Sequence, residues 1–119
     1  MDIIQTSLDG VPVLTIVGEA DHAIGPQLAQ AAQLAMSSGG ACILLDLEHC
    51  SYLDSGALGA ILGLVEQVEP RGWVGVIHCS RMVLRLLDLV GLTSSNSFWV
   101  FQSLDEARVM AAVGLKDRR

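Results

Sequence analysis

The stretch that decides the fold spans residues 42–66, and it reads CILLDLEHCSYLDSGALGAILGLVE. It begins with a short apolar run at 43–47, interrupted only by Asp46, whose length and composition predict a buried β-strand. It ends with apolar residues at the i, i+3, i+4, i+7 spacing of one helical face: Leu58, Ile61, Leu62 and Val65. An Asp-Ser-Gly turn at 54–56 separates the two. The stretch therefore predicts a strand, a turn and a core-facing helix.

The turn places an acid and a hydroxyl at the expected entrance of that helix. The side chain of Asp54 or Ser55 can accept a hydrogen bond from an N–H group of the first helical turn. An oxyanion carried on the hydroxyl would lie near the positive end of the helix dipole, which favours negative charge. The turn therefore suits both a helix cap and an anionic group.

The flanking sequence predicts further strands and helices. An Asp-Gly pair at 9–10 separates apolar runs at 3–7 and 11–17, a pattern typical of a β-hairpin. Two more apolar runs predict strands: 73–77 and 98–101. Amphipathic segments predict three more helices: 26–36, 81–90 and 104–113. Together these elements predict an α/β fold, with a mixed, mostly parallel sheet of about five strands covered by about four helices.

Caps and inward faces follow from the same patterns. Ser80 and Ser103 are expected to cap the second and third of these helices, and Gly91 to end the second. The inward residues expected in 26–36 are Leu28, Ala31, Ala32 and Ala35. Those expected in 81–90 are Val83, Leu86, Leu87 and Val90. We expect one domain at 1–114 and a frayed tail at 115–119.

The composition indicates a folded, acidic protein. Of 119 residues, 51% are hydrophobic and 17% are charged, which is too apolar for a disordered chain. The formal net charge of −6 disfavours nucleic acid and anionic membrane surfaces as partners. No apolar run reaches the ~20 residues of a membrane helix, and the first ten residues do not read as a secretory signal. We therefore expect a cytoplasmic protein without direct membrane insertion.

Several motifs in order along the chain resemble the STAS domain, the family of anti-sigma-factor antagonists. They are Gly-Glu-Ala-Asp at 18–21, Asp46, Asp-Ser-Gly-Ala-Leu-Gly at 54–59, Arg-Leu-Leu-Asp-Leu-Val-Gly-Leu at 85–92 and Ser-Leu-Asp-Glu-Ala at 103–107. The family pattern has a strand that ends in an Asp, a short loop, and Asp-Ser-Ser-Gly-Leu-Gly opening a helix. The resemblance covers nearly the whole chain and implies the STAS fold.

The resemblance also implies a function. An antagonist of this family binds an anti-sigma factor, a serine kinase, and thereby frees a sigma factor for transcription. The kinase then phosphorylates the antagonist, and a phosphatase restores binding. The family's usual acceptor position is Gly56 here, so Ser55 is the candidate phosphoacceptor. In this interpretation the chain is not an enzyme and needs no cofactor of its own.

Two other functions stay open. Accessory STAS subunits of membrane lipid-transport ATPases also carry one hydroxyl residue directly after the Asp, and there the domain is a structural brace. A scaffold that assembles with other STAS proteins is the third interpretation. The oligomeric state is open between a monomer and a homodimer.

The candidate partner-binding residues lie at the turn and along one edge of the helix: Asp21, Asp54, Ser55, Gly56, Gly59, Ala60 and Gly63. Interior glycines each cost a helix ~1 kcal/mol relative to alanine, so the small-residue stripe at 56–63 needs a reason. Close approach by another element supplies one. That element is either the chain's own sheet or first helix, or a helix of the partner. Asp46 is expected to orient the loop by accepting backbone N–H bonds, and Asp21 to lie near the same surface, but both could equally be turn formers.

Other chemistry is less well supported by the sequence. Ser55 lacks the Gly-x-Ser-x-Gly setting of a hydrolase, and no sequence feature places a histidine beside it. The glycines lack the lysine of a Walker motif. Three cysteines do not make a disulfide framework. The dipeptides His49-Cys50 and His78-Cys79 follow two predicted strands, but metal-binding spacings are absent. We therefore expect neither a catalytic nor a metal site.

Overall fold

The computed structural model describes residues 2–18, 24–37, 40–50, 52–69 and 71–113. Its elements, in chain order, are β1 (Asp2–Leu8), β2 (Val11–Val17), α1 (Ile24–Ala35), β3 (Cys42–Asp46), α2 (Ser55–Val68), β4 (Trp73–Ile77), α3 (Arg81–Leu89), the short 3-10 helix η1 (Leu92–Ser94), β5 (Phe98–Phe101) and α4 (Leu104–Val113). The predicted tail at 115–119 lies outside the described residues, so the division into domain and tail stays a prediction.

The strands form one sheet in the order β1-β2-β3-β4-β5. β1 and β2 pair antiparallel, and the pairs from β2 to β5 are parallel, which confirms the mixed, mostly parallel sheet. The hairpin turn has positive φ angles at both central residues, 51° at Asp9 and 87° at Gly10. Two-residue hairpins of this kind match the twist of the flanking strands, which explains why Asp-Gly marked the turn.

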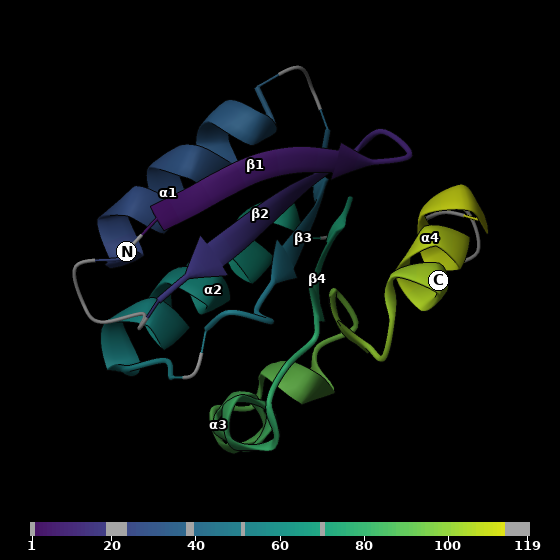
Figure 1. The fold of residues 1–119 in the computed structure, drawn as a ribbon. Coiled ribbons are helices and arrows are strands. Elements are labelled where there is room, and N and C mark those ends of the chain that lie inside the picture. Colours follow the sequence, from purple (N-terminus) through teal and green to yellow (C-terminus); the bar gives the residue numbers. More distant parts are fainter. Residues whose placement is uncertain (1, 19–23, 38–39, 51, 70, 114–119) are drawn as a thin grey trace.

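Helices cover the two faces of the sheet unequally (Figure 1). α1, α2 and α3 pack on one face, and α4 packs on the other face beside β4 and β5. The alternation of the strands serves both layers: in β4, Val74 and Val76 face the three helices, whereas Trp73 and Ile77 face α4. The uncovered part of the α4 face extends toward β1, where Ile4 is 51% exposed.

Two of the predicted inward residues are wrong. Leu62 is 40% exposed, because α2 turns Leu64 and Val68 toward the sheet instead. Val90 is 44% exposed, because α3 ends at Leu89 and Val90 is its C-cap, one step off the buried face. Both errors come from extending an apolar pattern one residue beyond the face that the sheet can cover.

Two boundaries also differ from the prediction. α1 begins at Ile24 rather than at Pro26, and Ile24 is buried in the core. Pro26 therefore sits in the first turn, where its missing N–H has no intrahelical partner to lose. β3 runs from Cys42 to Asp46 rather than over 43–47.

The predicted caps are confirmed: Ser80 accepts from Val83 N–H at 3.1 Å, Ser103 accepts from Glu106 N–H at 3.2 Å, and Gly91 has φ 84°.

Candidate functional site

The loop that connects β3 to α2 is fastened to the body of the fold. Leu47 N–H donates to the Ile77 carbonyl at 3.0 Å, which ties the loop to the end of β4. Gly18 N–H donates to the His49 carbonyl at 3.0 Å, which ties it to the end of β2. Leu47, Cys50 and Leu53 are buried in the core. The loop therefore presents the entrance of α2 from a fixed base.

Asp54 is the N-cap of α2. Its backbone is extended, with φ −90° and ψ −178°, and its Oδ1 accepts a hydrogen bond from Ala57 N–H at 3.0 Å. Its carbonyl accepts the first helical bond, from Leu58 N–H at 2.9 Å. The predicted cap is thus confirmed, and the acid rather than the hydroxyl provides it.

Ser55 is the first residue of α2, and its side chain is exposed. Its hydroxyl makes no hydrogen bond to any residue that the structure describes. Gly56 lies in the same first turn, where backbone N–H groups have no intrahelical acceptor. An exposed hydroxyl therefore lies beside a helix N-terminus, as the sequence predicted.

The small-residue stripe of α2 divides into two parts. Gly56 and Ala60 face α1, where a Cβ on Gly25 would lie 3.3 Å from the Gly56 carbonyl oxygen. Close approach of the chain's own first helix therefore explains these two positions. A Cβ on Gly59 or on Gly63 would meet nothing within 4 Å. Gly63 lies on the α1 side, where it lines a groove with Gly25, Pro26 and Ala29, so Gly59 is the position for which the described residues provide no packing reason.

The structure tests the two other predicted acids unequally. Asp46 accepts a hydrogen bond from Glu48 N–H, two residues on, at 3.0 Å, which fits both a role in orienting the loop after β3 and the simpler role of a turn former. Asp21 lies outside the described residues, as does His22. The prediction that Asp21 lies near the entrance of α2 therefore stays a prediction.

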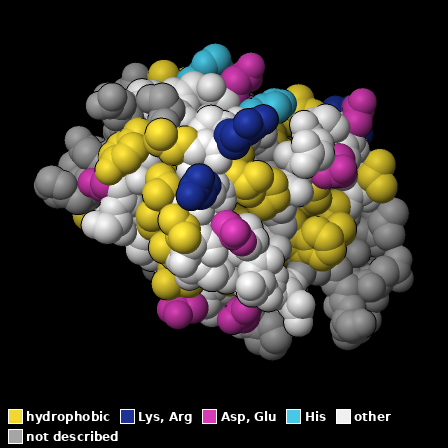
Figure 2. Space-filling view, turned by 90° about the horizontal axis from the view of Figure 1, so that it is seen from below, with side chains coloured by type: hydrophobic (Ala, Val, Ile, Leu, Met, Phe, Trp, Pro, Cys, Tyr) yellow, Lys and Arg dark blue, Asp and Glu magenta, His cyan; other side chains and the backbone are white. Residues whose placement is uncertain are grey.

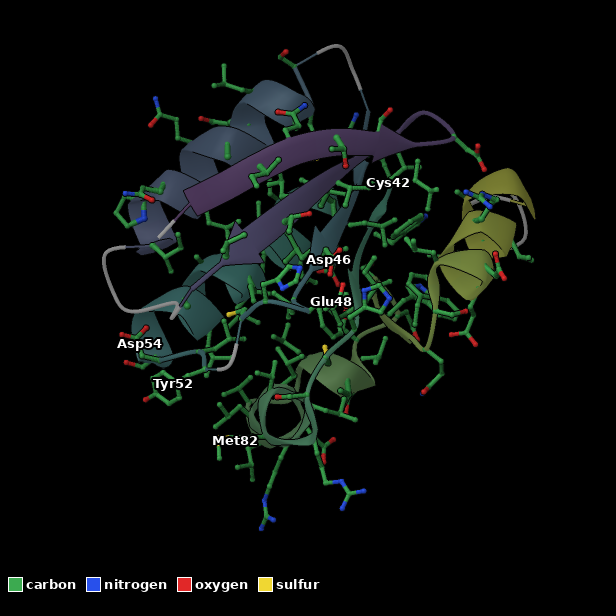
Figure 3. All side chains as sticks on the ribbon, viewed as in Figure 1. Cys42, Asp46, Glu48, Tyr52, Asp54 and Met82 are labelled. Atoms are coloured by element: carbon green, nitrogen blue, oxygen red, sulfur yellow. The ribbon has the colours of Figure 1, made fainter. Side chains whose placement is uncertain are left out.

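Exposed apolar side chains near this entrance were missed by the sequence analysis. Tyr52 is 46% exposed and Met82 is 60% exposed, and both lie at the lower edge of the molecule in Figure 3. Figure 2 shows that face directly, with hydrophobic side chains on either side of basic ones. The helical spacing of 81–90 places Met82 off the face that Val83 and Leu87 bury, so the sequence could have predicted that Met82 is exposed. An apolar surface of this kind suits protein contact.

Neither of the two described histidines, His49 and His78, is hydrogen-bonded to Ser55, so the described residues contain no Ser–His pair of the kind that activates a serine nucleophile. His78 Nδ1 lies 3.2 Å from Asp46 Oδ1, and His49 Nε2 lies 3.9 Å from Glu48 Oε1. No disulfide joins the three cysteines, all of which are described. Burial raises the pKa of the Cys79 thiol to about 12, and the nearby Cys50 acts in the same direction. That the chain has no enzymatic activity stays a prediction.

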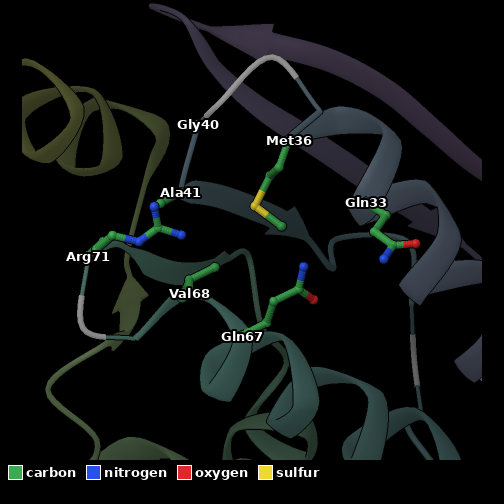
Figure 4. Close-up of a pocket in the computed structure, with 7 residues that line it drawn as sticks. All are labelled: Gln33, Met36, Gly40, Ala41, Gln67, Val68 and Arg71. Carbon is green, nitrogen blue, oxygen red and sulfur yellow. The ribbon is translucent and has the colours of Figure 1, made fainter.

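A separate cavity of about 300 Å³ lies between the ends of α1 and α2 and the start of β3 (Figure 4). It is lined by Gln33, Met36, Gly40, Ala41, Gln67, Val68 and Arg71. Arg71 is the one charged side chain among them, and the cavity lies at the opposite end of α2 from Ser55. It offers no constellation of reactive groups.

Among the described residues, no helix has the length and apolar composition needed to span a membrane.

Comparison with solved structures supports the architecture. An anti-sigma factor antagonist from Mycobacterium paratuberculosis has a TM-score of 0.78 and 25% identity, covering 91% of each chain. The anti-sigma factor antagonist SpoIIAA in its unphosphorylated form has a TM-score of 0.73 at 19% identity, covering 96% of this chain and 100% of the other. The phosphorylated form of SpoIIAA, a Bacillus cell fate determinant, has a TM-score of 0.70 at 20% identity, covering 92% and 100%.

The fold also occurs inside a larger protein. The murine anion transporter Slc26a9 is similar over 92% of this chain and 19% of its own, with a TM-score of 0.68 and 18% identity. The sequence model of the STAS domain matches residues 3–107 of this chain. The chain therefore belongs to the STAS-domain family.

Proposed function

We propose that this chain is an anti-sigma-factor antagonist that binds an anti-sigma factor, a serine kinase, and is released when the kinase phosphorylates Ser55. Membership of the STAS family and the likeness to anti-sigma factor antagonists support the first part. The phosphorylation of Ser55 is supported by one observation at the entrance of α2. Asp54 caps the helix, and the exposed Ser55 hydroxyl has no hydrogen bond to a described residue.

A phosphate on Ser55 is compatible with the folded state. It would carry about −1.5 to −2 charges beside the N-terminus of α2, where the helix dipole and the Gly56 N–H favour an anion. The Asp54 cap does not involve the Ser55 hydroxyl, so phosphorylation leaves the hydrogen bond to Ala57 in place. The modification therefore acts on docking rather than on folding.

The surface around Ser55 explains how one phosphate can release a partner. Tyr52 and Met82 offer exposed apolar contact area, and Gly59 lets another backbone approach the exposed edge of α2 closely. Phosphate next to Asp54 raises the negative charge at the rim of this area from −1 to about −2.5 to −3. A closely fitted partner then meets either like-charge repulsion or an unpaired charge that must lose its water.

The test is capture followed by reconstitution. Immobilised wild type and Ser55→Ala proteins are exposed separately to the soluble fraction and to the detergent-solubilised membrane fraction of the source cells, and captured proteins are identified by mass spectrometry. The captured kinase is then purified and incubated with each protein and magnesium-ATP. We expect wild type and Ser80→Ala to gain the mass of one phosphate group, at Ser55, and Ser55→Ala to gain none. Ser80→Ala controls for loss of a serine at the neighbouring helix entrance.

Other outcomes would contradict the proposal. Capture of a membrane transporter by wild type and Ser55→Ala alike, with no phosphate on Ser55, would favour the brace function instead. Phosphorylation of Ser55→Ala at another residue would remove Ser55 from the switch while leaving the antagonist function in place.

A further inference from the structure

Three side chains with metal-ligating atoms converge where β3 and β4 end. Asp46 is the last residue of β3, Glu48 follows two residues later, and His78 directly follows β4. His78 Nδ1 lies 3.2 Å from Asp46 Oδ1 and 3.8 Å from Glu48 Oε1. All three atoms lie within 4.8 Å of one another. Figure 3 shows Asp46 and Glu48 together at this end of the sheet.

The backbone holds these groups in place. Asp46 pairs in register with Ile77, and Leu47 N–H donates to the Ile77 carbonyl at 3.0 Å, so the two chain segments are locked side by side. Glu48 N–H donates to Asp46 Oδ1 at 3.0 Å, which orients that carboxylate. His78 has φ 59°, an unusual conformation for a residue with a side chain. The parallel pairing of β3 and β4 thus brings together residues that are 32 positions apart in the chain.

The cluster needs positive charge or a proton at its centre. Two carboxylates approach the same ring nitrogen, so Nδ1 either carries a proton that it donates to them or shares a bound cation with them. Ligand bonds of about 2.0–2.2 Å with tetrahedral angles put neighbouring ligand atoms about 3.4 Å apart. The observed separations of 3.2 and 3.8 Å bracket that value. The third pair, the two carboxylate oxygens, lies within 4.8 Å, so a metal ion bound by all three atoms requires these oxygens to approach each other by up to about 1.4 Å.

We propose that Asp46, Glu48 and His78 bind one divalent transition-metal ion of the zinc class, through Nδ1 and one oxygen of each carboxylate. An imidazole ligand favours zinc, cobalt or nickel over magnesium and calcium, which take oxygen ligands. The ligands are partly exposed, with side-chain exposures of 18% for Asp46, 58% for Glu48 and 29% for His78, so water completes the coordination. This site differs from the His-Cys pairs weighed in the sequence, and it does not rest on the proposed function.

The test measures metal binding by the whole chain after removal of bound metal with a chelator. Zinc is titrated by calorimetry, magnesium serves as the comparator, and cobalt reports the ligand type by its absorption spectrum. We expect one zinc ion per chain and no binding of magnesium at equal concentration. Asp46→Asn, Glu48→Gln and His78→Asn should each weaken zinc binding by at least about tenfold.

The variants separate loss of ligands from loss of fold. Asparagine tolerates the positive φ of residue 78, and Glu48 is exposed enough that Glu48→Gln leaves the core intact. Asp105→Asn removes an equal charge at a side chain that is 93% exposed on α4, and it should bind zinc like wild type. Equal zinc affinity in wild type and all three ligand variants would overturn the proposal. So would the absence of zinc binding by wild type, or a thiolate-to-cobalt charge-transfer band in the spectrum.

Discussion

The entrances of α2 and α3 have the same architecture and use serine in opposite ways. Each follows a neighbouring parallel strand, and each N-cap has an extended backbone, with φ −90° at Asp54 and −69° at Ser80. In each, a side-chain oxygen accepts from the N–H three residues on, at 3.0 Å at α2 and 3.1 Å at α3. At α3 the serine hydroxyl is itself the cap. At α2 the acid caps, and the serine follows it.

The difference shows what an Asp-Ser pair provides that a serine alone does not. A phosphate on Ser80 would have to form on the oxygen that holds the first turn of α3. A phosphate on Ser55 forms on an oxygen that holds nothing among the described residues, while Asp54 keeps the turn. The pair therefore separates the residue that stabilises the helix from the residue that can be modified.

The largest expected effect concerns the thiol of Cys79, the residue directly before Ser80, which caps α3. Burial raises the pKa of Cys79 to about 12, whereas an unfolded cysteine ionises near about 8.5. At pH 8 the folded protein should therefore alkylate at Cys79 at least about a hundredfold more slowly than the urea-denatured protein, because the thiolate is the nucleophile. Iodoacetamide labelling followed by peptide mass spectrometry measures both rates.

The pH dependence gives the internal control for that experiment. Above about pH 9 the rate for the denatured chain should level off, since its thiol is ionised. The rate for the folded chain should continue to rise by about tenfold per pH unit toward the raised pKa. Equal rates at pH 8 would show that folding does not protect the Cys79 thiol, and would contradict the raised pKa.

The second prediction compares the same new charge at the two entrances. Ser55→Asp should weaken binding to the captured kinase by about a hundredfold, roughly 2.7 kcal/mol, because the charge lies in the proposed docking surface. Ser80→Asp should leave binding within about twofold of wild type, and it should unfold like wild type because aspartate caps as well as serine. Calorimetry with the purified kinase measures the binding, and equal weakening by both variants would argue against a specific role for Ser55.

The third prediction removes each cap in turn. Asp54→Ala and Ser80→Ala should each lower the free energy of unfolding by about 1–2 kcal/mol, because each leaves a first-turn N–H without its acceptor. Ser55→Ala should change it by less than about 0.5 kcal/mol. Urea unfolding followed by circular dichroism measures all three. A loss for Ser55→Ala as large as that for Ser80→Ala would mean that the two serines have the same structural role.

Local chemistry made much of this comparison predictable from the sequence. The Asp-Gly turn at 9–10, the Ser80 and Ser103 caps and the left-handed Gly91 each depend on a few neighbouring residues, and all are confirmed. The sequence also identified the turn at 54–56 as the entrance of a helix. It left open whether Asp54 or Ser55 would be the cap, because either oxygen can reach the N–H of the first turn.

Features that depend on distant pairing were not predictable in the same way. The cluster of Asp46, Glu48 and His78 exists because β3 and β4 pair in one register, and neither strand reveals its register alone. Leu62 was wrongly placed inward because helical spacing defines a stripe but not which edge of the stripe the sheet covers. Met82, by contrast, lies outside the inward face that the spacing predicts for α3, so its exposure could have been predicted.

The smallest expected effect concerns the glycines of the two helices. Gly59 lies inside α2, and a Cβ there would meet nothing within 4 Å, so Gly59→Ala should raise the free energy of unfolding by about 0.5–1 kcal/mol. Gly91 ends α3 with φ 84°, so Gly91→Ala should lower it by about 1 kcal/mol. Urea unfolding measures both. If Gly59→Ala is more stable yet binds the kinase more weakly, the glycine serves the partner. If Gly59→Ala is less stable, the chain's own fold requires the glycine. The glycine would then no longer support a docking surface on the exposed edge of α2.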